Sequence, residues 1–167
     1  MNVRLKVLWK VPVFCSLASV ITFFITIYSG KFFTIVEIAE DGTKYGSTDP
    51  VRSTIFTIAM VLIVLLAGGL WYFRSMTKAE IALSAAIMSV IYLVIHLMQI
   101  PFGVLPGWLG IAIIYSRTWQ NDVGSLAYSL VEQNWISIAV GCLAPLLFVP
   151  FGKKSATADT AEETVET

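Results

Sequence analysis

The chain has 167 residues, of which 57% are hydrophobic and 13% are charged, and its formal net charge is +0. Soluble domains carry about 25% charged residues, so this composition excludes an ordinary soluble domain and indicates an integral membrane protein. The basic residues sit at the ends of apolar stretches and form no stripe, which argues against nucleic acid as a partner.

Four apolar stretches predict transmembrane helices, because about 20 apolar residues cross a bilayer. They cover about residues 11–29, 53–73, 79–100 and 135–151. We therefore expect an all-α membrane protein in which residues 1–151 form a single four-span bundle. The first apolar run is too long for a signal peptide and lacks a cleavage site, so it is expected to be retained. The acidic, Thr/Ala-rich tail over 152–167 predicts disorder.

Small residues at helical spacing predict where these spans pack against one another. They are Ser16 and Ser19 in the first span, Gly68 and Gly69 in the second, Ala82 and Ala86 in the third, and Ser137 and Gly141 in the fourth. Pro145 predicts a kink in the last span. Asp49-Pro50 is a helix-start signal for the second span, and Thr77 with Glu80 forms a capping box for the third.

The segment between the first two spans predicts a short β-hairpin outside the membrane. Asp41-Gly42 stands there between a run with β-branched residues and a short polar return, a typical hairpin signal.

The segment after Pro101 predicts a re-entrant or amphipathic outer loop. Its apolar run, Gly107–Tyr115, is too short to span. Asn121 or Asp122 is then expected to cap a short amphipathic helix on the membrane surface or over the mouth of the bundle. Its apolar side would carry Val123, Leu126, Ala127, Leu130 and Val131. An alternative with 102–115 as a fifth span is disfavoured, because it places Lys153 and Lys154 outside.

Charge predicts the orientation, because basic residues stay on the cytoplasmic side. With four spans and both termini in the cytoplasm of a plasma-membrane protein, seven basic residues lie inside and four outside. The inside set is Arg4, Lys6, Lys10, Arg74, Lys78, Lys153 and Lys154, and the outside set is Lys31, Lys44, Arg52 and Arg117.

The third span carries a polar stripe, Ser89, Tyr92, His96 and Gln99, at helical spacing on one face. Inside a bilayer such a stripe must be satisfied by neighbouring helices, water or a ligand. A ligand pocket would lie between the outer end of this span and residues 101–132. The alternative is a His–Tyr–Gln network that only joins helices.

Metal and cofactor chemistry is not expected. His96 is the only histidine, and Cys15 and Cys142 each lie in an apolar block outside any C-x-x-C pair, so both cysteines are interpreted as small apolar residues. No motif of a hydrolase, zinc protease or P-loop protein is present.

These observations predict a non-enzymatic protein of the lipid bilayer. The favoured role is a binding or accessory subunit, with a membrane-protein partner or a second copy of the chain, or a small protective membrane protein. The alternative is a small-solute or lipid-handling carrier that uses the stripe of the third span.

Overall fold

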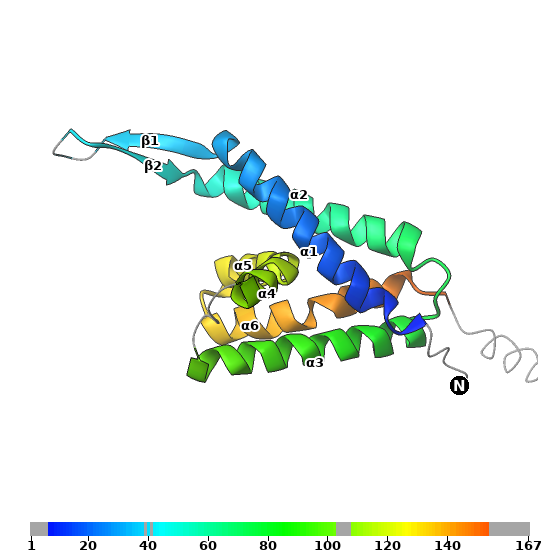
Figure 1. Ribbon diagram of the computed structural model, residues 1–167. Helices are drawn as coiled ribbons and strands as arrows, with labels where there is room; N and C mark the ends of the chain where they lie inside the picture. The colour runs from blue at the N-terminus through cyan, green and yellow to red at the C-terminus, as the bar shows by residue number, and fades with distance from the viewer. Residues whose placement is uncertain (1–6, 39, 41, 103–107, 154–167) are drawn as a thin grey trace, which may run out of the picture.

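The computed structural model describes residues 7–38, 40, 42–102 and 108–153, with backbone alone for 99–102, 108, 109 and 114. The protein is mostly helical, with one small sheet (Figure 1). Its elements are α1 (Lys10–Ser29), η2 (Gly30–Phe32), β1 (Thr34–Ile38), β2 (Lys44–Thr48), α2 (Pro50–Leu66), η3 (Ala67–Tyr72), α3 (Lys78–Phe102), α4 (Trp108–Ser116), α5 (Thr118–Val131), α6 (Asn134–Leu143) and η4 (Ala144–Phe151).

The four predicted spans are confirmed as helical stretches long and apolar enough to cross a membrane. They are Lys10–Phe32, Pro50–Tyr72, Lys78–Met98 and Asn134–Phe151. Between 28% and 33% of the apolar window of each is buried inside the protein, so most of their apolar surface requires an apolar surrounding. In contrast α4 has 9 residues, about 14 Å at a rise of about 1.5 Å per residue, which is too short for a fifth span.

Two local signals are confirmed at the starts of α2 and α3. The side chain of Asp49 accepts hydrogen bonds from the backbone N–H groups of Val51 (3.0 Å) and Arg52 (3.1 Å), so α2 begins at Pro50. The Thr77 N–H donates to the Glu80 carboxylate (2.9 Å), and the Glu80 N–H donates to the Thr77 hydroxyl (3.3 Å). This reciprocal pair is the expected capping box.

The predicted β-hairpin is also confirmed. β1 and β2 pair antiparallel, with Thr34 opposite Thr48 and Glu37 opposite Tyr45, and Gly42 in the turn adopts φ 82°. A hydrogen bond to Glu37 raises the pKa of the Tyr45 phenol. The hairpin projects beyond the ends of α1 and α2 (Figure 1).

The other ends of the spans meet in one place. The Lys10 ammonium donates to the Ser75 hydroxyl (3.4 Å) in the α2–α3 turn. The Lys78 N–H donates to the Lys153 carbonyl (3.0 Å), and the Lys153 N–H donates to the Met76 carbonyl (3.0 Å). Gly152 and Lys153 are thus held against the start of α3. Residues 154–167 lie outside the described part.

The Ser84 hydroxyl on α3 forms hydrogen bonds with the backbone at the start of α1. The Val11 N–H donates to the Ser84 hydroxyl (3.3 Å), which itself donates to the Leu8 carbonyl. Ser84 and Ala85 are fully buried, whereas Ala82 is half-buried and Ala86 is exposed. The small residues of α3 that are fully buried here, Ser84 and Ala85, therefore differ from the predicted pair.

Gly68 and Gly69 lie where aromatic rings close over the end of the second span. The span widens there into a π-helix, η3, and the rings of Phe14, Phe148 and Phe151 press onto it. A Cβ on Gly68 would lie 2.6 Å from the Phe148 ring, and one on Gly69 would overlap the Phe151 ring. The rings of Phe148 and Phe151 come from η4, a 3-10 segment that follows α6, so the fourth span changes helix type around Pro145.

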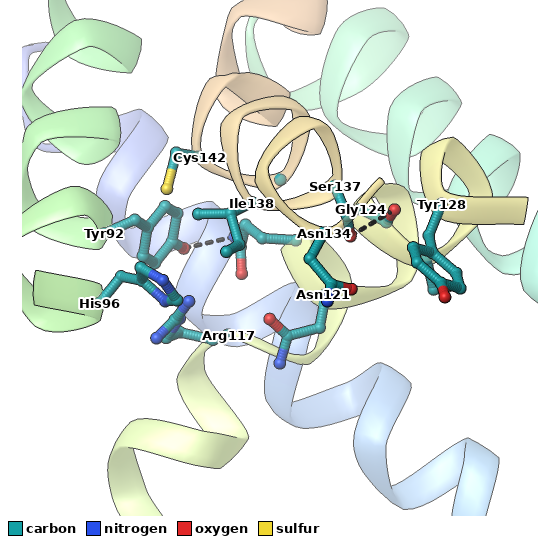
Figure 2. A pocket seen from close by; sticks show the side chains of 13 residues that line it. Tyr92, His96, Arg117, Asn121, Gly124, Tyr128, Asn134, Ser137, Ile138 and Cys142 are labelled. Atoms are coloured by element: carbon teal, nitrogen blue, oxygen red, sulfur yellow. Dashed lines mark hydrogen bonds between the residues drawn. The ribbon is translucent and has the colours of Figure 1, made fainter. Parts of the chain in front are cut away.

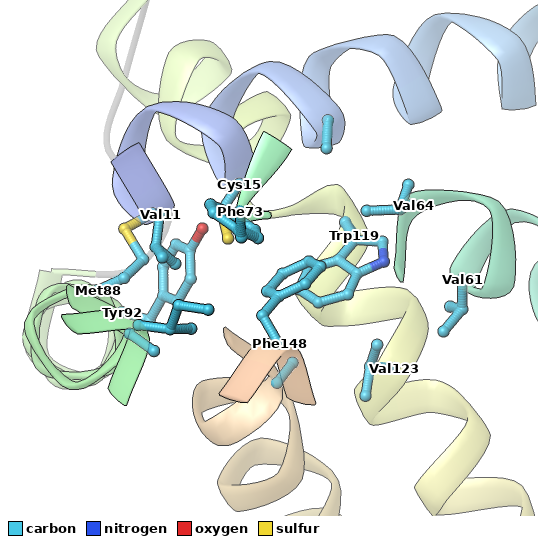
Figure 3. Close-up of a cluster of buried hydrophobic side chains, with 14 of the residues drawn as sticks. Val11, Cys15, Val61, Val64, Phe73, Met88, Tyr92, Trp119, Val123 and Phe148 are labelled. Carbon is cyan, nitrogen blue, oxygen red and sulfur yellow. The ribbon is translucent and has the colours of Figure 1, made fainter. Parts of the chain in front are cut away.

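The start predicted for α5 is wrong. The helix begins at Thr118, before Asn121 and Asp122, and its first half is buried rather than spread on a surface. Trp119 is fully buried and stacks on Phe148 with ring centroids 5.4 Å apart (Figure 3). On the predicted apolar side, Val123 is buried and Leu126 packs against the core, whereas Leu130 at the far end is 84% exposed.

We predict that Gly69→Ala destabilises the protein, whereas Gly30→Ala does not. The new methyl group must displace the Phe151 ring, and overpacking of this kind costs about 1–3 kcal/mol. A Cβ on Gly30 meets no atom within 4 Å, so that variant is the matched control. Thermal unfolding in mild detergent measures both, and equal midpoints would contradict this account of the α2 end.

Candidate functional site

A pocket of about 460 Å³ lies between α3, α5 and α6 (Figure 2). It is lined mainly by polar side chains, together with Ile138 and small residues. The lining consists of Tyr92, His96, Arg117, Gln120, Asn121, Gly124, Ser125, Tyr128, Asn134, Ser137, Ile138, Gly141 and Cys142. The concave shape and the convergence of polar groups are typical of ligand sites.

Helical spacing brings these side chains to one place. On α3, Tyr92 and His96 are one turn apart and share a face. Arg117 stands at the turn between α4 and α5, and Asn121 and Ser125 follow it at intervals of four residues on α5. Asn134 is the first residue of α6. The pocket therefore depends on the helical turn at Arg117.

The far wall of the pocket is a close contact between α5 and α6. The Ser137 hydroxyl donates to the Gly124 carbonyl (2.8 Å). A Cβ on Gly124 would lie 2.7 Å from the Ser137 carbonyl oxygen, and one on Gly141 would lie 2.9 Å from the Gln120 carbonyl oxygen. Ser137 and Gly141, two of the predicted packing residues, thus face α5, and no side chain larger than glycine fits at either glycine without movement.

A buried hydrogen-bond network forms the floor. Gln120, only 2% exposed, donates from its amide to the Tyr92 hydroxyl and accepts from the Ser19 hydroxyl (3.3 Å). The Ser19 hydroxyl also accepts from the backbone N–H of Trp119 (3.3 Å), and the Tyr92 hydroxyl donates to the Ser116 carbonyl (3.5 Å). The network joins α1, α3 and the α4–α5 turn. A predicted packing residue, Ser19, takes part in it.

The structure places the residues of the predicted polar stripe in different surroundings. Tyr92 and His96 line the pocket. Ser89 does not line it, and its buried hydroxyl finds no hydrogen-bond partner among the described residues. The side chain of Gln99 lies outside the described part of the structure.

Sequence reasoning missed Arg117, Gln120 and Asn134. The spacing of Arg117, Asn121 and Ser125 was a usable signal, because three polar residues at intervals of four lie on one helix face. Nothing in the sequence marks Gln120 as buried or Asn134 as a pocket residue.

The lining carries an excess of positive charge. Arg117 is permanently cationic, His96 adds ring N–H donor capacity, and none of the residues described as lining the pocket is Asp or Glu. No group of three or more His, Cys, Asp or Glu residues in the described part of the chain could hold a metal ion. The arrangement is suited to binding acceptor groups and negative charge.

A second cavity, about 440 Å³, lies between α1 and α3 and is largely apolar. Tyr92 lines it as well, so this ring separates the polar pocket from the apolar one. Ser16, the remaining predicted packing residue of α1, lines this cavity and is half-buried.

Comparison of the chain with protein-family models, with curated proteins and with solved structures finds no match in any of the three.

We predict that Tyr92→Phe lowers stability, whereas Tyr128→Phe does not. Removal of the buried hydroxyl leaves the Gln120 amide without its acceptor, at a cost of about 1–3 kcal/mol. Tyr128 lines the same pocket but is exposed, so the same substitution there is the control. The thermal unfolding midpoints of both variants in detergent test this prediction. Unchanged midpoints for both Tyr92→Phe and Tyr128→Phe would show that the network contributes no stability.

Proposed function

We propose that this protein binds a small polar ligand, or the polar part of a lipid, in the pocket between α3, α5 and α6. The observation that carries the proposal is the convergence of Tyr92, His96 and Arg117 with two asparagine side chains on one cavity. His96 lies within the third membrane-length helix, Lys78–Met98, and an ionisable residue inside a membrane span is costly and marks a candidate functional site. This favours the carrier or lipid-handling role over a purely structural one.

The way the pocket is built supports binding rather than helix packing alone. Gln120 and Tyr92 line the pocket and bond to each other, whereas His96 and Asn121 line it from α3 and α5 (Figure 2). If the polar groups only joined helices, we would expect them to be bonded to each other as Gln120 and Tyr92 are.

We propose further that the protein lies in the plasma membrane with both termini in the cytoplasm. The described basic residues Lys10, Arg74, Lys78 and Lys153 gather at one end of the spans, where Lys10 reaches the α2–α3 turn and Lys78 bonds to Lys153. Basic residues favour the cytoplasmic side. The hairpin and the mouth of the pocket would then face outward.

A large side chain at Ser125 tests the binding role. Ser125→Trp should fill the pocket and abolish retention of a co-purifying small molecule or lipid, as measured by native mass spectrometry of protein from its own membrane. Ser129→Trp is the matched control: Ser129 is exposed one turn further along α5, outside the pocket lining, and both hydroxyls donate to a carbonyl three residues earlier (2.8 Å each). Equal ligand retention by the two variants would contradict the proposal.

Cysteine labelling tests the orientation. In a chain carrying Cys15→Ala and Cys142→Ala, a membrane-impermeant maleimide added to intact cells should label Glu40→Cys in the hairpin turn and leave Ala156→Cys in the tail unlabelled. Lysis should make both reactive. Labelling of the tail residue in intact cells would overturn the assignment.

The accessory-subunit role remains the second candidate, and the exposed hairpin favours it. Val36 and Ile38 are 69% and 67% exposed on β1, beyond the ends of the helices. A membrane-protein partner or a second copy could cover them. Cross-linking from the hairpin in native membranes would distinguish the two partners.

A further inference from the structure

The charge inside the pocket specifies the chemistry of the ligand. Arg117 is half-buried at the α4–α5 turn, and a guanidinium presents a planar fork of N–H donors that matches phosphate or carboxylate oxygens. His96 reaches the same cavity from α3. A metal cation or an ammonium ligand would be repelled there.

The start of α6 adds donors to the same cavity. Its N-cap residue, Gln133, does not cap the helix. The Gln133 side-chain oxygen instead accepts from the Trp135 indole N–H (2.6 Å). The first-turn amides of α6 therefore have no side-chain cap, and Asn134, the first helical residue, lines the pocket. A helix N-terminus carries partial positive charge and favours anions.

The lining offers both hydrogen-bond donors and acceptors, and among the described lining residues Arg117 carries the permanent charge. The hydroxyls of Ser125 and Ser137 donate to backbone carbonyls of α5 and so contribute oxygen lone pairs. Arg117 and the amide groups of Asn121 and Asn134 supply N–H donors. None of the described lining residues is Asp or Glu, so the described lining adds no carboxylate charge of its own.

We infer that the pocket binds a phosphate-type oxyanion, with Arg117 as its anchor and Asn134 at the start of α6 as a second contact. This inference rests on the proposed binding function and names its ligand class. A phospholipid headgroup and a water-soluble phosphate share this chemistry.

The test uses the full-length protein in uncharged detergent and follows its thermal midpoint with three probes: dioctanoyl phosphatidic acid, dioctanoylglycerol and inorganic phosphate. A ligand that binds the folded state raises the midpoint. Stabilisation by phosphatidic acid but not by dioctanoylglycerol supports a lipid headgroup. Stabilisation by inorganic phosphate as well supports a water-soluble phosphate. Equal stabilisation by dioctanoylglycerol and phosphatidic acid, or none by either phosphate probe, overturns the inference.

Variants locate the binding site. Arg117→Gln should weaken binding of the phosphate probe by about tenfold or more, because a charge-assisted hydrogen bond is lost. Arg74→Gln, at an exposed arginine at the opposite end of α3, should bind normally. Unchanged binding by Arg117→Gln would overturn the assignment of the anchor.

A second variant keeps the test decisive if Arg117→Gln fails to fold. Asn134→Asp places a negative charge in the pocket while an acid in the first turn favours the helix, so it should fold and bind the phosphate probe several-fold more weakly. Undiminished binding by this variant would contradict the inference. If Ser125→Trp expels a ligand that carries no negative charge, the binding function stands and the oxyanion inference fails.

Discussion

Gln120 is a buried amide, only 2% exposed, and a buried amide requires partners for both its donor and its acceptor. Its oxygen accepts from Ser19 on α1, and its nitrogen donates to Tyr92 on α3. These two bonds fix α5 relative to both spans. Trp119, the neighbouring residue, adds apolar contact by stacking on Phe148. The arrangement of α5 among the spans depends on this pair of residues.

The pocket is a consequence of how α5 is held. Close contact at Gly124 and Gly141 draws α5 against α6, while α3 approaches α5 through the Tyr92–Gln120 bond. Above that bond the three helices leave a space. The side chains that border it, including His96 and Arg117, come from different elements of the chain. Tyr92 and Gln120 are bonded to each other within the same lining.

Much of the fold was predictable because it depends on residues close in the chain. Span length follows from hydropathy, the start of α3 from Thr77 and Glu80, and the hairpin from the turn residues before Lys44. The site was predictable only in part. Tyr92 and His96 were predicted because they share a helix face one turn apart. The spacing of Arg117, Asn121 and Ser125 indicates a shared polar face, but it does not indicate which helices that face will meet.

The sequence alone determined that the chain has four membrane-length helices, where two of them begin, and which face of the third is polar, because each of these depends on periodicity and capping within about one or two turns. Only the tertiary structure decided that α5 is inserted among the spans and that the polar face opens onto a cationic pocket. The reason is distance along the chain: Ser19 and Gln120 are separated by 101 positions, and the polar stripe that opens on His96 acquires its neighbours only when such remote segments pack together.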